Sequence, residues 1–443
     1  MARKRFVLAA ALLVGAVGCE DFLTGGELDT DPNRPSVATP TQRFVATQAT
    51  LWQYYASDLP RITTLWAQQG TGNSQQYLDY HRYDIDESVS NTWHQGLYGA
   101  GGLVDIRLTQ DALREEGDSL FLGISQVQEA LLMTAGADFF GDLVYSQALQ
   151  REEGADPALD PQLDVYDALL ALLDEAIVNM SRTGPTNAGP GPADLAYNGD
   201  RARWTKLAHT LKARIHLRTA EVRPGAYAQA LTEARLGLTT AADNFLARFG
   251  GGAGEENFWY QFSVVERAGY WIPNTSFVTL LQTRGDPRRN TYFNAAGSQL
   301  AAERLAAGFD QPLITANENL LIWAEAAYRT GATGEATTQL NAARALAGLP
   351  AISPAGVELL REILTEKYIA TFQTTEAWVD YKRTCFPNLA PITAGQDVPA
   401  RFFYDINEIN TNSNIPPADE QPARNANDPA NATDPFGNAC LAQ

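Results

Sequence analysis

Two stretches of this chain combine aromatic rings with amide side chains, a mixture that suits the binding of carbohydrate. Sugars present apolar C–H faces and many hydroxyl groups, so flat rings and planar amides are their complementary partners. The first stretch covers residues 68–83, and the second covers residues 255–271. We predict a ligand-binding site in these loops. The candidate binding residues are Gln69, Asn73, Gln76, Tyr77, Tyr80, Trp259, Tyr260 and Trp271.

Composition alone leaves other interpretations of these residues open. Each ring can instead be a core or loop anchor, because Trp and Tyr are ordinary material for a protein interior. The same mixture of rings and amides also suits a peptide ligand. The loops therefore favour binding of a nutrient oligomer without deciding between an oligosaccharide and a peptide.

No catalytic residue, cofactor or metal ligand is predicted. The chain has no Gly-rich phosphate loop, no GxSxG and no HExxH. Its many Asp and Glu residues could place two carboxylates together by chance, so a glycoside hydrolase stays as an alternative to a binding protein. The scattered histidines and the cysteines lack metal-ligand spacing, and His209 and His216 are expected to border helix packing. The four histidines are His81, His94, His209 and His216.

Length and charge set further bounds. The chain has 443 residues, enough to bury a large core, and its formal net charge is −19. Nucleic acid is excluded as a partner, because binding phosphates requires a basic surface. Loose adsorption to an anionic membrane is disfavoured for the same reason.

The N-terminus predicts export. Residues 3–5 are basic, residues 6–17 are apolar, and Cys19 follows small residues, as in a bacterial lipoprotein signal. Ala16 stands where a larger aliphatic residue is commoner. We expect residues 1–18 to be removed as a signal peptide, Cys19 to be lipidated, and residues 19–38 to form a tether. Export makes a disulfide between Cys385 and Cys440 compatible with the sequence, as are two buried thiols.

The remaining chain, residues 39–443, has mainly helical periodicity and forms one expected domain. One segment, residues 194–218, has an Asn198–Gly199 turn, Asp200 as helix cap and then apolar residues at helical spacing. Its basic residues Lys206, Lys212 and Arg214 are expected to pair with acidic neighbouring helices. Further helices are predicted over residues 39–55, 104–115, 119–139, 165–180, 227–238, 320–329, 335–347 and 357–372. Pairs among these resemble tetratricopeptide units, and the chain after residue 388 is an irregular tail.

Motifs in a consistent order resemble those of the SusD/RagB family of nutrient-binding outer-membrane lipoproteins. They lie at residues 19–23, 31–35, 135–145, 197–212, 366–384 and 398–404. One departure is Val144, where the family usually has Pro.

This resemblance implies a mainly α fold of tetratricopeptide-like helix pairs with an irregular, loop-rich ligand-binding half. It implies a non-enzymatic, cell-surface protein, lipid-anchored to the outer membrane, that passes oligosaccharide to a SusC-like TonB-dependent transporter. A peptide ligand, as in the RagB branch, is the alternative. The matching motifs belong to the scaffold, so the resemblance assigns no individual ligand residue.

Overall fold

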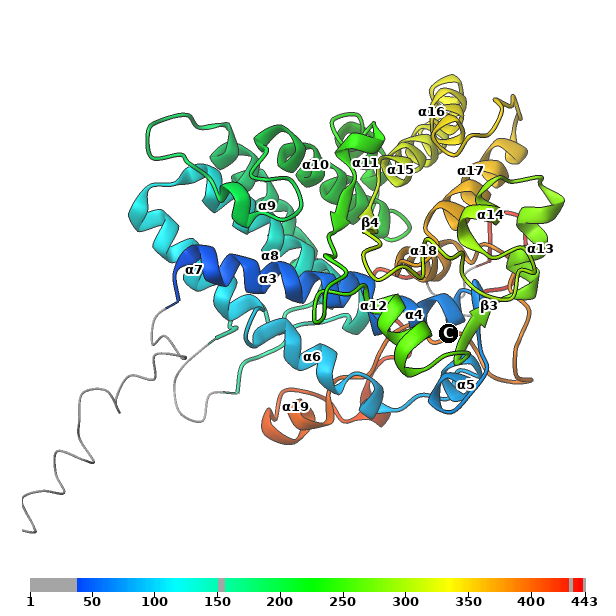
Figure 1. Cartoon of the computed structure of the whole chain (residues 1–443), viewed down its shortest axis with the longest axis horizontal. Helices are drawn as coiled ribbons and strands as arrows, with labels where there is room; N and C mark the ends of the chain where they lie inside the picture. The colour runs from blue at the N-terminus through cyan, green and yellow to red at the C-terminus, as the bar shows by residue number, and fades with distance from the viewer. Residues whose placement is uncertain (1–37, 150–155, 430–432, 441–443) are drawn as a thin grey trace, which may run out of the picture.

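Helices dominate the computed structural model, which describes residues 38–149, 156–429 and 433–440 (Figure 1). The helices of the first half are α3 (Pro40–Ala56), α4 (Asp58–Trp66), α5 (Gln76–His81), α6 (Asn91–Tyr98), α7 (Leu103–Glu116), α8 (Ser119–Phe140), α9 (Gln162–Ser181) and α10 (Arg201–Arg218). Those of the second half are α11 (Ala226–Ala234), α12 (Phe258–Tyr260), α13 (Thr275–Thr283), α14 (Arg288–Tyr292), α15 (Ala316–Arg329), α16 (Thr333–Leu346), α17 (Val357–Ala370), α18 (Glu376–Thr384) and α19 (Ile406–Thr411). Short helical turns are η1 (Glu87–Val89), η2 (Gly191–Ala193), η3 (Ala241–Asp243), η4 (Gln261–Glu266) and η5 (Ala418–Glu420). The predicted mainly α fold is confirmed.

Capping explains where the predicted helices begin. The Thr39 hydroxyl accepts from the Gln42 backbone amide at the start of α3, and the Gln42 side-chain oxygen accepts from the Thr39 backbone amide. Asp200 accepts the first amides of α10, as predicted from the sequence. Helix α11 instead ends four residues before the predicted boundary at Leu238. The Leu238 amide donates to the Thr210 hydroxyl at 2.9 Å, so the chain leaves the helical path there.

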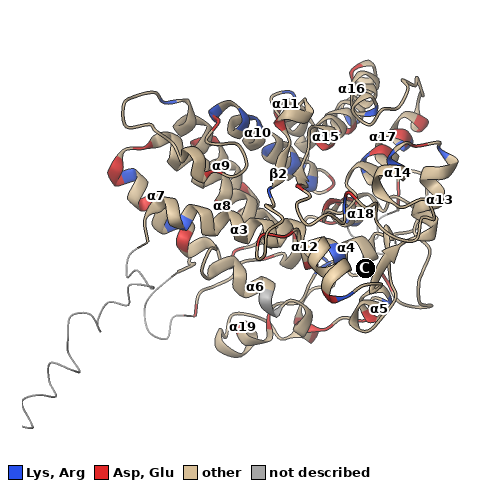
Figure 2. Cartoon of the chain, in the orientation of Figure 1, with Lys and Arg blue, Asp and Glu red and all other residues tan. Residues whose placement is uncertain are grey.

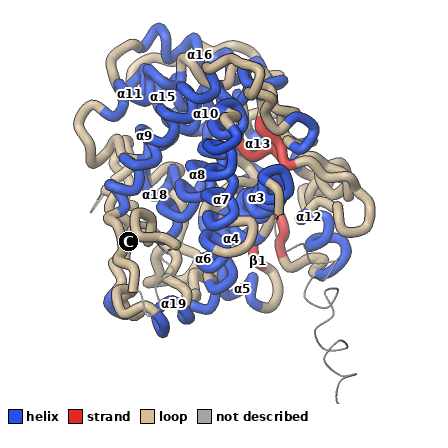
Figure 3. Tube along the Cα trace, turned by 90° about the vertical axis from the view of Figure 1, so that its left-hand side faces the viewer, coloured by secondary structure: helices blue, strands red, loops and turns tan. Residues whose placement is uncertain are grey.

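Antiparallel helix pairs form the upper layer of the molecule in the views of Figures 1 and 3. Helix α8 packs on α9, α10 on α11, and α15 on α16, while α15 also contacts α11 and α17. Small residues let α15 and α16 approach closely, as predicted. Those buried at the crossing are Ala324, Ala326, Ala327, Ala336 and Ala343.

Two short antiparallel sheets join distant parts of the chain. Strand β1 (Gly70–Gly72) pairs with β3 (Trp271–Pro273), and β2 (Phe245–Ala247) pairs with β4 (Gln311–Ile314). In the first sheet Gly70 lies opposite Pro273 and Gly72 opposite Trp271. These pairings hold the loops against the helical layer.

The basic stripe of α10 pairs with acidic residues of adjoining segments, as predicted. Lys206 contacts Asp243 at 3.0 Å, and Lys212 contacts Asp174 at 2.7 Å. Figure 2 shows basic positions in blue along α10. These basic residues of α10 therefore form ion pairs within the chain.

Deeper in the protein, Glu376 at the start of α18 connects two arginines of α10. Arg214 and Arg218 contact its carboxylate at 3.2 and 2.9 Å. Arg214 also pairs with Glu318 at 2.6 Å, and Arg218 with Asp138 at 2.6 Å. Burial raises the pKa of Asp138 and of Glu318, and the arginines oppose that shift. We call Asp138, Arg214, Arg218, Glu318 and Glu376 the α10 charge cluster.

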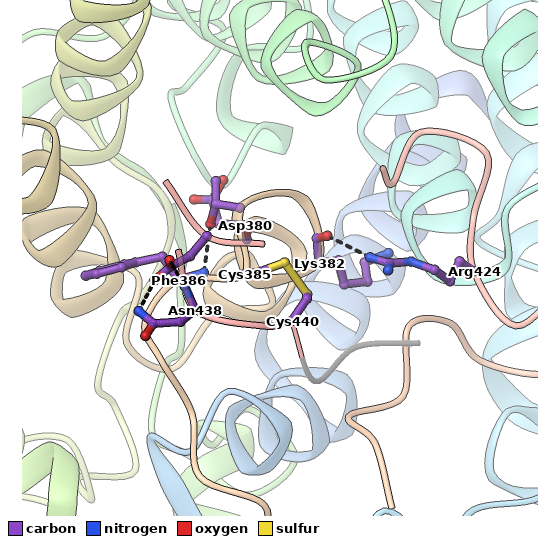
Figure 4. Close-up of a disulfide and its surroundings, with 9 residues drawn as sticks. Asp380, Lys382, Cys385, Phe386, Arg424, Asn438 and Cys440 are labelled. Atoms are coloured by element: carbon purple, nitrogen blue, oxygen red, sulfur yellow. Dashed lines mark hydrogen bonds between the residues drawn. A yellow bond between two sulfur atoms is a disulfide. The ribbon is translucent and has the colours of Figure 1, made fainter. Parts of the chain in front are cut away.

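The irregular tail is tied to the helices by a disulfide between Cys385 and Cys440, 55 residues apart (Figure 4). Cys385 directly follows the last residue of α18, and both half-cystines are buried. Nearby, Arg424 donates to the Lys382 carbonyl at 3.2 Å. The tail thus wraps on the body, and of the two alternatives left by the sequence the structure has the bridge.

The predicted signal peptide, Cys19 and nearly all of the tether lie outside the described residues. Within residues 38–149, 156–429 and 433–440, no helix is both long and apolar enough to cross a bilayer. The same part of the chain holds no group of three or more His, Cys, Asp or Glu side chains arranged to bind a metal ion. His209 instead contacts Glu233, at 2.7 Å.

Candidate functional site

The two loops that the sequence singled out are brought together by the β1–β3 pairing. Beyond the strands, the Asn73 amide donates to the Tyr270 carbonyl at 2.8 Å, and its side chain donates to Gly269 at 3.2 Å. A Cβ atom at Gly72 would lie 1.7 Å from the Tyr77 carbonyl oxygen. Glycine at this position is therefore required for the close approach of β1 and α5.

Four of the predicted binding residues are buried and serve as anchors. Gln69, Tyr77, Trp259 and Trp271 expose 0, 2, 0 and 5% of their surface. The Gln69 amide donates to the Tyr368 carbonyl at 2.6 Å, and the two Trp rings pack edge to face, 5.2 Å between centroids. Rings enclosed in this way have no free face for a sugar. For these residues the structure gives the core role that the sequence had left as the alternative.

The other four predicted residues remain accessible. Asn73 and Gln76 are exposed, whereas Tyr80 and Tyr260 are half-buried. Tyr80 packs on Tyr77, 5.6 Å between centroids, and its carbonyl accepts the indole N–H of Trp66 at 3.1 Å. Of the eight predicted residues, Gln76 and Tyr77 border a surface hollow, which α4, α5, α12 and η4 enclose.

This first hollow has a volume of about 220 Å³ and a charged floor. Arg61 lies over the Phe262 ring at 4.3 Å and donates to the Tyr77 hydroxyl at 3.0 Å. Asp58 accepts from both Arg61 and Tyr77. Burial raises the pKa of Tyr77, and its hydroxyl proton is donated to Asp58 at 3.0 Å. Arg61, Asp58 and Phe262 were not predicted from the sequence.

A larger hollow of about 570 Å³ adjoins the first, and Phe258 and Gln261 border both. Its apolar wall consists of three rings: the Trp52 and Phe249 centroids are 6.0 Å apart, and those of Phe249 and Phe258 are 5.4 Å apart. We call the two adjoining hollows the α12 groove. In Figure 1, α12 lies at the front of the molecule next to α3 and α4.

Polar side chains surround this aromatic wall. They are Gln53, Arg248, Glu255, Glu256 and Gln261. Glu256 accepts from the Gly254 amide at 2.8 Å and from Gln261 at 3.2 Å. Backbone hydrogen bonds, joined by the Gln261 bond, lower the pKa of Glu256, so its carboxylate is ionised at neutral pH. The groove therefore combines ring surfaces with amide and carboxylate groups suited to hydroxyl-bearing ligands.

The sequence signals for the missed residues were present but weak. Trp52 has the helical spacing of a core residue in α3, and it exposes only 8% of its surface. Phe249 precedes the glycine run, and Phe258 precedes Trp259, which the sequence predicted as a binding residue. Only tertiary packing decides which of two adjacent rings turns inward.

Residues 68–83 contain three non-glycine residues with left-handed backbone, and others lie elsewhere at Leu149, Asn198, Gln373 and Cys385. Gln68, Gln75 and Tyr83 have φ values of 54°, 48° and 68°, in the left-handed region that non-glycine residues rarely occupy. Such conformations persist only where the surroundings impose them, and they are frequent at ligand sites. Here the side chain of Gln68 donates to the Ala390 carbonyl at 2.6 Å, which secures the loop to the tail.

Comparison with known proteins agrees with this architecture. A family model described as "SusD-like_2: Starch-binding associating with outer membrane" matches residues 32–405. A SusD/RagB family protein from Bacteroides thetaiotaomicron is 22% identical, with a TM-score of 0.70, over 86% of this chain and 95% of that chain. A chitin-binding SusD homolog from Flavobacterium johnsoniae is 18% identical, with a TM-score of 0.69, over 88% of this chain and 98% of that chain. A search of curated proteins found no match.

Proposed function

This chain belongs to the SusD-like family, and we propose that it is a cell-surface lipoprotein that captures oligosaccharides for uptake. The observation that carries the proposal is the α12 groove, where three aromatic rings face amide and carboxylate side chains. The larger hollow, at about 570 Å³, falls within the usual range for small-ligand sites. The chitin-binding homolog of the same fold supports a carbohydrate ligand.

Binding in this groove requires no covalent chemistry. Rings such as Phe249 and Phe258 offer faces to the C–H groups of a sugar, while Gln53 and Gln261 can donate to and accept from its hydroxyls. Each shielded ring contact contributes roughly 1 kcal/mol. Three such contacts supply about 3 kcal/mol of the roughly 8 kcal/mol that a micromolar complex requires, so hydrogen bonds must add to them and efficient capture depends on a further step.

We assign that step to a SusC-like TonB-dependent transporter in the outer membrane. In this proposal the protein closes over the transporter barrel, which traps the ligand above it. Lipidation of Cys19 would keep the protein at the membrane, since an acyl chain supplies an anchor without a spanning helix. Co-purification from detergent-solubilised outer membranes tests the partnership, and loss of membrane retention in Cys19→Ser tests the anchor.

The ligand class is tested by isothermal titration with starch and chitin oligosaccharides beside a panel of peptides. We expect binding to at least one oligosaccharide and weaker binding in Phe249→Ala. Peptide binding without any glycan binding would contradict the carbohydrate assignment. Release of labelled products from a bound glycan would contradict the non-enzymatic role.

A further inference from the structure

A separate cavity of about 280 Å³ lies between α14, β4 and the ends of α16 and α17. It shares no lining residue with the α12 groove. Leu346 at its border is 44% exposed, so the cavity has access to solvent. Its polar lining includes Asn244, Arg288, Arg304 and Asn317. We call it the α14 cavity.

Arg304 is a partly buried cation with only neutral partners. Its guanidinium lies over the Tyr292 ring at 4.5 Å and also faces Phe372 at 5.6 Å. Its Nε donates to the Thr291 carbonyl at 3.0 Å, and Nη1 donates to Gln373. In the described part of the chain no carboxylate lies within 4.0 Å of it. Burial lowers the pKa of Arg304, as expected for a cation without a close counter-charge.

Arg288 brings a second unused donor to the same cavity. Its Nε and Nη2 bond to Asp286, and Nη2 also reaches Glu366 at 2.5 Å. Its Nη1 is buried and has no hydrogen-bond partner among the described residues. A buried donor without an acceptor costs free energy, and an acceptor oxygen admitted beside it by a small side-chain movement would recover that cost.

The charges around the cavity indicate what that ligand is. Asp286 pairs with Arg288, Glu366 is shared by Arg284, Arg288 and Arg344, and Arg214 pairs with Glu318, which also lines the cavity. Among these cations Arg304 is the one without a carboxylate within 4.0 Å in the described part of the chain, although Glu303 acts on it from a greater distance. A single negative charge would balance it, whereas a dianion would also meet repulsion from the nearby carboxylates.

From this arrangement we infer that the α14 cavity binds a small ligand through its carboxylate group. Guanidinium donors match the planar, two-oxygen geometry of a carboxylate. The cavity volume, about 280 Å³, lies near the lower end for ligand sites, which suits one monosaccharide-sized acid. Such a group occurs on a free small acid and on a uronic acid unit of a longer glycan. The inference goes beyond the proposed function, because the cavity is separate from the α12 groove.

Isothermal titration of the full chain with sodium glucuronate tests this inference, with glucose as the uncharged control of similar size. We expect heat of binding for glucuronate and none at this cavity for glucose. In Arg304→Gln the affinity should fall at least about tenfold, the scale of a lost hydrogen bond between charged groups. The matched control is Arg182→Gln, which makes the same change at an exposed position and should bind normally.

Further ligands identify the source of the carboxylate, and a second variant tests the inference if the first one fails to fold. Lactate represents a free acid, and an oligogalacturonide represents an acidic glycan; binding of either supports the inference and names its source. Ala347→Phe narrows the cavity while both arginines remain, so it should also weaken binding even if Arg304→Gln fails to fold. Absence of carboxylate binding, binding of inorganic phosphate in its place, or binding unchanged in both variants would overturn the inference.

Discussion

Around α10, charged side chains are buried against one another, whereas around α12 polar side chains border open hollows. In the α10 charge cluster, Glu376 bridges two arginines, and each arginine has a second carboxylate. In the α12 groove, Gln53 and Glu255 face a hollow instead of a partner helix. The buried ion pairs of the first region hold helices together, whereas the polar side chains of the second region are available to a ligand. The two regions should therefore respond differently to substitution.

The largest effect is expected in the α10 charge cluster. Glu376→Gln removes the shared counter-charge of Arg214 and Arg218, leaving buried cations undercompensated. We expect the free energy of unfolding to fall by about 3–5 kcal/mol, measured by urea denaturation. Asp111→Asn is the control, because its ion pair with Arg114 is exposed and contributes below about 1 kcal/mol. Equal losses in the free energy of unfolding for the two variants would contradict the expected difference between buried and exposed ion pairs.

A smaller loss is expected where β1 meets α5. Gly72→Ala would place a Cβ atom 1.7 Å from the Tyr77 carbonyl oxygen, so the backbone must move. Overpacking of this kind costs about 1–3 kcal/mol, and Tyr77 should shift with α5, which also weakens glycan binding. Gly334→Ala in α16 meets no atom within 4 Å and should not destabilise the protein. Thermal unfolding and titration of both variants separate these outcomes.

Acid should lower the free energy of unfolding through His94, a buried histidine of α6. Burial lowers its pKa to about 4, and neither ring nitrogen has a hydrogen-bond partner among the described residues. Because the folded pKa lies below the usual 6.5, the unfolded chain binds this proton more readily. The associated stability is complete above pH 6.5 and is lost as the pH falls toward 4.

Between about pH 7.5 and pH 5 this histidine should account for a loss of about 2 kcal/mol. His94→Phe keeps a ring against Phe140 and Tyr404 but cannot be protonated. Its free energy of unfolding should therefore vary less with pH than that of the parent protein. Identical pH profiles for the two proteins would rule out His94 as a source of acid sensitivity.

The smallest free-energy change is expected in the α12 groove, where it should affect binding. Phe249→Ala removes the central ring of the aromatic wall, and we expect oligosaccharide affinity to fall about two- to tenfold. Tyr328→Ala removes a half-buried ring of α15, away from the groove, and should leave that affinity unchanged. A loss of affinity only in Tyr328→Ala would place the glycan elsewhere.

The helical scaffold could be predicted from the sequence because its signals are local. Asp200 was predicted as the cap of α10, and of the two threonines that could cap α3, Thr39 and Thr41, the structure uses Thr39. The internal pairing of Lys206 and Lys212 was also predictable, since acidic residues were abundant on neighbouring helices.

The groove was less predictable because burial is a tertiary property. Residues 68–83 and 255–271 do meet, yet within them Trp259 turns inward while Phe258 borders the hollow. Trp52, on a helix distant in sequence, completes the wall. Neither residue type nor spacing distinguishes a ring that faces a ligand from one that faces the core.

The bond between Cys385 and Cys440 closes a covalent ring around 55 residues of tail. A protease that cuts once within this ring would produce two polypeptides that remain linked. The fragments would separate on a gel only after reduction. Such a cut would leave the C-terminal fragment attached to Cys385, directly after α18, the helix that carries Glu376. The ring thus gives the protein tolerance to cleavage at its most irregular segment.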